Sequence, residues 1–154
     1  MISIRRATVK DYDEMLRMAV EFTAQHQAGD PVDPDQFSQY FEASLPGHPM
    51  LMLVATQHSK PCGMLFGLVY PLFFNAARTN CQELMIWVDP ASRASTAASD
   101  LVAAWEAWGA DMGATRFLLT SPVHDRINAV ERLYRAWGYT PLEHTFCKEI
   151  KLCQ

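Results

Sequence analysis

At 154 residues, the chain is long enough to bury one hydrophobic core and has the usual size of one domain. Hydrophobic residues make up 49% of it and charged residues 19%, which is ordinary for a globular protein. The formal charge of −4 argues against the broad basic surface that binding to nucleic acid requires.

The N-terminus lacks the charged-then-apolar pattern of a secretion signal, and no apolar run reaches the length that crosses a membrane. The four cysteines are scattered, with neither a Cys-x-x-Cys pair nor a zinc-type spacing to histidine: Cys62, Cys81, Cys147 and Cys153. We therefore expect a cytoplasmic protein with free thiols and with neither a metal nor a membrane partner.

The first part of the chain predicts one strand and two helices. Residues 2–7 alternate apolar and polar side chains, which is typical of a strand. Apolar residues then recur at helical spacing from Thr8, a helix cap, to about Gln25. After a turn-rich break, a second helix is expected to begin at Asp33 or Asp35 and to carry Phe37, Tyr40, Phe41 and Leu45.

The middle of the chain is rich in strands. Two strands are predicted over residues 50–55 and 62–70, and a third over 83–88. Residues 76–80 are predicted to form the loop into the third strand. The pair Phe73-Phe74 stands beside that loop, where it is either exposed and binds a partner or packs against the sheet.

The second half predicts two helices and further strands. One helix follows from the apolar residues Ala98, Leu101, Val102, Trp105, Trp108 and Met112. Residues 116–120 read as a buried strand. A last helix carries the stripe Ile127, Val130, Tyr134 and Trp137 and ends before Gly138. Residues 140–152 are expected to complete the sheet with one or two strands.

The strand over residues 83–88 leads through small residues into a helix. Backbone N–H groups in the first turn of a helix lack internal partners and add to the positive end of the helix dipole, so such a junction can bind phosphate. Small side chains let a phosphate approach the backbone, and Arg93 adds a cation with a fork of donors. Alternatively, Ser92 or Ser95 only caps a core helix.

Residues 93–98, Arg-Ala-Ser-Thr-Ala-Ala, resemble the pyrophosphate-binding loop of the GNAT superfamily of acyl-CoA-dependent N-acyltransferases. The family pattern is Gln or Arg, two residues, Gly, one residue, then Gly or Ala. Arg93 and Ala98 match it, whereas Thr96 stands where the first glycine belongs. The β-carbon of Thr96 is a potential obstacle to a phosphate.

A second resemblance to the same family lies downstream. Asn128 is followed six residues later by Tyr134, and Gly138-Tyr139 follows four residues after that, as in the GNAT segment around the last helix. The resemblance covers nearly the whole chain and implies a single GNAT domain over residues 1–154. The implied fold class is α/β or α+β, with a mixed twisted sheet of six to seven strands flanked by about four helices.

The resemblance also implies a binding site for acetyl-CoA, the acyl donor. Its pyrophosphate would be held by Arg93 and the residues that follow: Ala94, Ser95, Thr96, Ala97, Ala98 and Ser99. A backbone N–H of Trp87 or Val88 would polarise the thioester carbonyl. Asn128 would bond to the pantetheine arm or to the neighbouring strand, although an isolated Asn at this place is also a common helix cap.

Acyl transfer from a thioester to an amine also needs a base and an acid. The family's acid is often the tyrosine of the last helix, here Tyr134, which otherwise only fills core. Glu83 is the first candidate for the base, because partial burial at the start of its strand would raise its pKa; otherwise it is solvated. His124 is the second candidate, and is otherwise a surface histidine.

The resemblance thus implies direct transfer of an acetyl group from acetyl-CoA to a primary amine in a ternary complex. The amine belongs to a small molecule or a protein, and a homodimer through the late strands is an option. The competing interpretation is a catalytically inactive GNAT-like binding or structural module, which Thr96 and the alanine-rich loop favour. Residues 83–90 also look like a strand of small GNAT proteins encoded by tailed bacteriophages, which suits either function.

Overall fold

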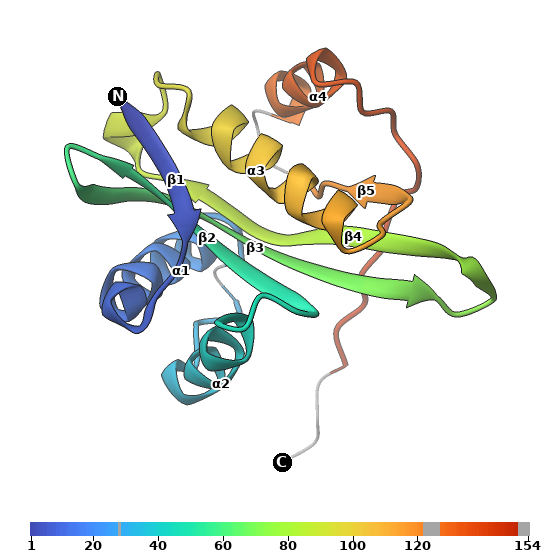
Figure 1. The fold of residues 1–154 in the computed structure, drawn as a ribbon, viewed down its shortest axis with the longest axis horizontal. Coiled ribbons are helices and arrows are strands. Elements are labelled where there is room, and N and C mark those ends of the chain that lie inside the picture. The colour runs from blue at the N-terminus through green and yellow to red at the C-terminus, as the bar shows by residue number, and fades with distance from the viewer. Residues whose placement is uncertain (28, 122–126, 151–154) are drawn as a thin grey trace. The chain divides into compact units, whose positions relative to one another are not determined.

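The computed structural model describes residues 1–27, 29–121 and 127–150, which form two compact units (Figure 1). The first unit, Met1–Pro122, holds the sheet and three of the helices described below. The second unit, Val123–Gln154, contains the helix α4 (Ile127–Ala136). Within the described residues, no helix is both long enough and apolar enough to cross a membrane.

The first unit is built on a five-stranded sheet in the order β1-β2-β3-β4-β5. The first four strands are antiparallel, and β5 runs parallel to β4. The strands are β1 (Ile2–Arg6), β2 (Met50–Gln57), β3 (Lys60–Leu72), β4 (Asn75–Val88) and β5 (Arg116–Leu118). The expected mixed α/β fold is confirmed, with fewer strands than predicted.

Helices cover both faces of this sheet (Figure 1). On one face lie α1 (Tyr12–His26), which follows a short 3-10 turn, and α2 (Pro34–Ser44), which Asp33 caps through two backbone N–H groups. On the other lies α3 (Ala97–Asp111), whose Trp105 is fully buried against β3 at Gly67. Apolar side chains at helical spacing therefore bury one stripe of each helix, as the sequence predicts.

The predicted loop over residues 76–80 is wrong, because these residues belong to β4. The chain reverses at Phe73 and Phe74 instead, and both side chains are largely exposed. Residues 75–80 are poor strand formers by composition, but Thr79 and Asn80 pair with Pro71 and Tyr70 of β3. Pairing with a neighbouring strand overrides intrinsic preference here.

The prediction of one or two strands over residues 140–152 is also wrong as far as these residues are described. Residues 140–150 are exposed and form neither strand nor helix, and 151–152 lie outside the described residues. A strand needs a partner for its backbone N–H and C=O groups, and Pro141 removes one donor from this segment. The sheet described therefore has five strands instead of six or seven.

Candidate functional site

The site is organised by a fork between two parallel strands. β4 pairs with β5 only over Asn80, Cys81 and Gln82, so the edge of β4 from Glu83 onward has no strand beside it among the described residues. This open edge runs to Val88 and ends at the loop before α3. A strand edge without a partner presents unpaired backbone donors and acceptors, which a ligand with amide groups can use.

A bulge at the fork changes which face each β4 side chain occupies. Phe66 pairs with Met85 and Gly67 with Glu83, so Leu84 is the extra residue. Glu83, opposite Gly67, lies on the α3 face. Met85 and Trp87 pack on the opposite face, with the core beneath α1. Adjacent parts of one strand thereby serve two different surfaces.

Two backbone N–H groups, of Trp87 and Val88, are predicted to donate to the thioester carbonyl. Only one of them lies on the open edge of β4. Asp89 N–H donates to Cys62 O of β3 at 2.9 Å, so by alternation Trp87 N–H also faces β3. Val88 then faces the open edge, and its C=O accepts from Arg93 Nε there at 3.0 Å. Of the two candidates, Val88 N–H has the orientation that a ligand at the fork requires.

Glu83 is a buried carboxyl at the fork. It is 3% exposed, and its Oε2 accepts the N–H of Thr120, just past β5, at 3.1 Å. Burial raises the pKa of Glu83 from 4.5 to about 7, although the Thr120 hydrogen bond lowers it. A carboxyl with a pKa near neutrality can accept a proton at physiological pH, as a general base must.

Three backbone N–H groups are presented by the start of α3. The helix begins at Ala97, whose N–H is accepted by Ser95 Oγ at 3.2 Å. The next two N–H groups, of Ala98 and Ser99, have no partner within the described part of the chain. The N-cap position is Thr96, and the Ser95 hydroxyl before it accepts one first-turn N–H, so two first-turn donors are left for an anion.

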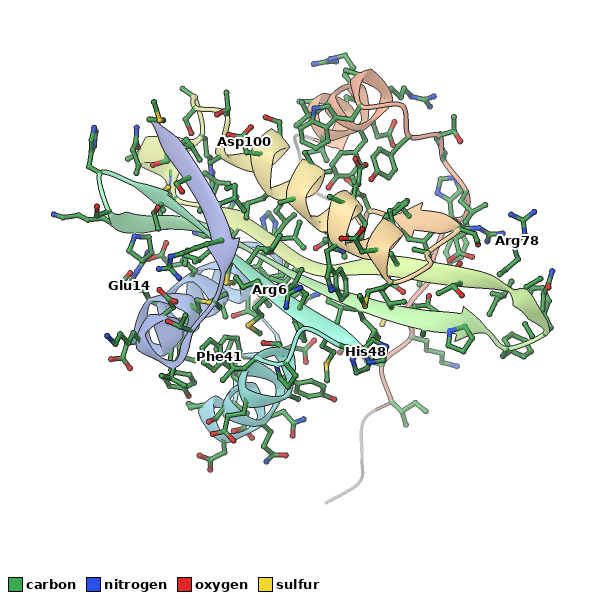
Figure 2. The ribbon with its side chains drawn as sticks, in the orientation of Figure 1. Arg6, Glu14, Phe41, His48, Arg78 and Asp100 are labelled. Carbon is green, nitrogen blue, oxygen red and sulfur yellow. The ribbon has the colours of Figure 1, made fainter. Side chains whose placement is uncertain are left out.

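Two side chains modify this helix start. Thr96 has φ −81° and ψ 3°, a conformation open to any residue, so glycine is not needed there for the backbone. Its hydroxyl donates to Asp100 Oδ2 at 2.6 Å. Asp100 lies in the first turn of α3 (Figure 2), where its carboxylate stabilises the helix dipole and opposes a second anion.

Arg93 does not stand free at the mouth of the loop. Its guanidinium lies 4.8 Å from the centroid of the Trp87 ring, a cation–π contact. Its Nε donates to Val88 O, and Nη2 donates to Gln25 Oε1 of α1 at 3.2 Å. The residue is exposed, so its charge faces solvent, but an incoming phosphate has to share or displace these contacts.

An ion pair that the sequence did not reveal ties α1 to the same loop. Arg17 donates to both carboxylate oxygens of Asp89, at 3.2 and 2.9 Å, and Trp87 Nε1 donates to Asp89 Oδ1 at 2.9 Å. Asp89 is the first residue after β4 and lies 72 positions from Arg17. The only sequence signal here is Asp89-Pro90 after a strand. This dipeptide indicates a turn and does not identify Arg17 as the partner of Asp89.

The remaining predicted residues belong to the second unit or lie outside the description. Tyr134 is half-buried on α4, with its ring near Trp137 and Tyr139 at centroid distances of 5.9 and 6.3 Å. Asn128 is exposed in the first turn of the same helix. His124 lies outside the described residues. These three residues are therefore not joined to the fork by the described geometry.

A pocket of about 200 Å³ opens between α2 and the sheet, on the face of Met85. Its apolar walls are made of aromatic rings and thioethers: Phe37, Tyr40, Met52, Met64, Phe66 and Met85. Asp33 and Gln36, at the start of α2, are the polar residues that line it. Phe37 also packs against the core cluster, whereas Tyr40 is exposed.

Comparison with known families assigns the fold. The model of the Acetyltransferase (GNAT) family matches residues 13–139, which include the fork, the loop and α4. The chain belongs to the GNAT family. The resemblance of the loop and of the last helix to this family is therefore confirmed. Membership of this family and its fold support an acyltransferase.

Solved structures share the GNAT fold along the full chain at low identity. A transcriptional regulator from Bacillus halodurans C-125 has a TM-score of 0.81 at 17% identity and covers 97% of this chain and 100% of its own. AAC(6')-Iy, solved with a CoA-S-monomethyl-acetylneamine bisubstrate analogue, has a TM-score of 0.76 at 16% identity, covering 99% of each chain. Glucosamine-6-phosphate N-acetyltransferase from Arabidopsis thaliana reaches 0.75 at 15%, covering 98% and 99%.

The search of curated proteins returned no match for this GNAT chain. The neighbours therefore establish the fold, and the residues of the site have to be argued from their own geometry. Within the described part of the chain, no group of three or more His, Cys, Asp or Glu residues is arranged to hold a metal ion.

Proposed function

We propose that this GNAT protein transfers the acetyl group of acetyl-CoA to a primary amine by direct attack in a ternary complex. The observation that carries the proposal is the fork. A buried carboxyl with a raised pKa and an open strand edge lie along β4, and the start of α3 follows them after one loop. Together they provide amide pairing, proton acceptance and anion binding.

The donor half of the site would bind acetyl-CoA through backbone groups. The pantetheine arm carries amides that can pair with the open edge of β4, with Val88 N–H directed at the thioester carbonyl. The pyrophosphate would accept from the N–H groups of Ala98 and Ser99, among the small side chains of residues 94–99, with the Arg93 charge nearby. The groups present thus fit the donor, apart from the Thr96 β-carbon and the Asp100 carboxylate.

The chemistry needs one proton to leave the amine and one to reach the thiolate. In the proposed step, the amine nitrogen attacks the carbonyl carbon, the C–S bond breaks and Glu83 takes the amine proton, directly or through a water at the fork. Its raised pKa makes this transfer effective near pH 7. Tyr134 is the proposed acid for the thiolate, and Asn128 the proposed contact to pantetheine. His124 remains the second candidate for the base.

A second candidate function is a GNAT-like domain without catalysis. Arg93 is engaged with Trp87, Val88 and Gln25, and Asp100 places a negative charge at the helix start. Both features oppose the binding of a pyrophosphate. In a module that binds a partner without acetyl-CoA, the contacts of Arg93 and the carboxylate of Asp100 would not impair function.

Titration of the purified protein with acetyl-CoA separates the two functions. The wild type is expected to bind with a micromolar dissociation constant, and Arg93→Ala to weaken binding by roughly tenfold because one phosphate-facing cation is lost. Isothermal titration calorimetry is the measurement. If the wild type does not bind and Thr96→Gly does, the loop is closed by one side chain and the catalytic proposal is wrong.

Removing the charge of Asp100 is expected to strengthen donor binding and weaken the fold. In Asp100→Asn, acetyl-CoA affinity should rise about threefold at low salt, because one like charge near the pyrophosphate is gone. The free energy of unfolding should fall by about 0.5 kcal/mol, because a negative charge is lost from the first turn. Titrations at 20 and 500 mM salt test this, and equal affinity of both proteins at low salt would contradict it.

A further inference from the structure

We infer that the acceptor of this protein is an amine with an aromatic or branched aliphatic body, which the pocket between α2 and the sheet receives. This inference rests on the proposed function, since it names the class of amine that the same site would take. It follows from three observations: the chemistry of the pocket wall, the charge of the segment that builds the wall, and the place of the pocket on β4.

The wall of the pocket is made almost wholly of apolar atoms. Met52 and Met64 form its floor, at 2% and 1% exposure, and Phe66 and Tyr40 form a side, with their rings edge-to-face at 6.3 Å. Thioethers adapt to irregular ligands and contact aromatic rings favourably. A sugar ring in this pocket would leave its hydroxyl groups without partners, which is costly.

The size of the pocket suits a substituted phenyl ring. An apolar cavity of about 150 Å³ holds benzene. The volume here is about 200 Å³, which leaves room for one short linker beside a ring. Met85, which also lines the pocket, lies on β4 directly after the bulge. A ring among these methionines with a two-carbon linker would direct its amine along β4 to its open edge, which borders both the face of Met85 and the face of Glu83.

The negative charge of the segment around the pocket favours binding of the cationic amine there over binding of the acyl group of the anionic donor. Residues 18–59 include five acidic residues and no Lys or Arg, whereas the whole chain has a net charge of −4. The segment contains α2 and therefore the outer wall of the pocket. Its negative potential attracts a cation and repels the anionic coenzyme A, so a pocket at this place is matched to the cationic substrate.

The polar end of the pocket agrees with this assignment. Asp33 Oδ1 already accepts the N–H groups of Asp35 and Gln36, at 2.9 and 3.2 Å. Its carboxylate is thereby held in place at the exposed rim. A fixed negative charge at the entrance of an apolar pocket favours ligands that combine a cation with an apolar body.

Three matched probes test the inference through binding alone. 2-Phenylethylamine carries a ring and a cation, ethylamine has the same cation without the ring, and 3-phenylpropanoate has the ring with an anion. Titrations with and without coenzyme A are expected to show 2-phenylethylamine binding at least tenfold more tightly than either of the other two. Tighter binding of 3-phenylpropanoate, or equal binding of the two amines, would overturn the inference.

A pair of glutamine variants on α2 locates the binding. Gln36 lines the pocket, and Gln39 is exposed three residues later on the same helix and lines neither this pocket nor a second one near Tyr12. Gln36→Trp is expected to fill the pocket and weaken 2-phenylethylamine at least tenfold, whereas Gln39→Trp should leave its affinity unchanged. The same loss in both variants would place the amine elsewhere.

The two levels of the proposal fail in different ways. Binding of 2-phenylethylamine in the pocket without acetylation supports the inferred amine class and contradicts the proposed transferase. Acetylation of glucosamine 6-phosphate or neamine in preference to 2-phenylethylamine supports the transferase and overturns the amine class. If 2-phenylethylamine binds in neither titration, the pocket does not serve the acceptor and the inference is wrong.

Discussion

Glu83→Gln is expected to reduce kcat/KM for amine acetylation by about 100-fold, the usual contribution of a positioned general base. Glutamine keeps the shape of the side chain and can still accept the Thr120 N–H, but it cannot take a proton. The rate of the wild type should rise with pH through about 7, where Glu83 loses its proton, and this limb should vanish in the variant. Steady-state kinetics between pH 5.5 and 9 test this.

The matched control for this variant is Glu143→Gln, an exposed glutamate of the second unit. It removes a carboxylate from an exposed position, so kcat/KM and its pH dependence should equal those of the wild type. If Glu83→Gln retains the wild-type rate and pH profile, Glu83 is not the base, and His124 becomes the candidate to test next.

The same variant has a signature in stability that does not depend on catalysis. Because burial raises the pKa of Glu83 from 4.5 to about 7, the folded protein holds this proton more tightly than the unfolded chain. This contribution to stability is complete below pH 4.5 and is lost as the pH rises through about 7. Its size is on the order of 3 kcal/mol. Denaturant unfolding at pH 5 and 8 should show that loss in the wild type and not in Glu83→Gln.

Gly67→Ala is expected to lower the free energy of unfolding by about 2 kcal/mol, the cost of overpacking a filled core. A β-carbon at this position would collide with the Trp105 ring, at 2.6 Å from Cδ1 and closer to Nε1. Trp105 is fully buried and cannot move aside without moving α3. The effect should extend to the fork, since Gly67 pairs with Glu83 at the bulge.

A double-mutant cycle with Trp105→Phe tests this cause. Phenylalanine has no Nε1, the ring atom nearest to the new β-carbon, and within the described part of the chain Trp105 Nε1 has no hydrogen-bond partner to lose. Gly67→Ala should therefore cost about 1 kcal/mol less in the Trp105→Phe background. Gly29→Ala is the matched control, because nothing lies within 4 Å of its β-carbon position. Additive effects of the two changes at positions 67 and 105 would show that the collision is not the cause.

The elements that the sequence predicted well are those whose signal is local. The helices α1, α2 and α3 carry apolar residues at helical spacing, and Asp33 caps α2 as expected. The strand over residues 76–80 was missed because its signal is not local: its partners are β3 and, at Asn80, β5. Periodicity describes one element at a time, so it predicts helices better than the extent of a hairpin.

The site divides in the same way. The motif in the loop and the buried carboxyl at the start of the β4 edge were recognisable from neighbouring residues. The stacking of Arg93 on Trp87 and the pairing of Arg17 with Asp89 were not, because each joins the loop to α1 or to β4 through the fold. The pocket likewise needs α2, β2, β3 and β4 together, and no single stretch of sequence contains it.

Leu84, the extra residue of the bulge, decides which face of the sheet the neighbouring residues of β4 occupy. Faces alternate along a regular strand, so Glu83 and Met85, two residues apart, would share a face; with Leu84 bulged out between them, they lie on opposite faces. Deleting Leu84 would make Glu83 and Met85 direct neighbours, still opposite Gly67 and Phe66, so both side chains would keep their faces and only the bulge would be lost. A change of length at Phe73 and Phe74, where the hairpin turns in solvent, disturbs no such relation. The chain is therefore free to vary in length at the tip of this hairpin, and at its centre one extra residue lets the same strand serve both faces of the sheet.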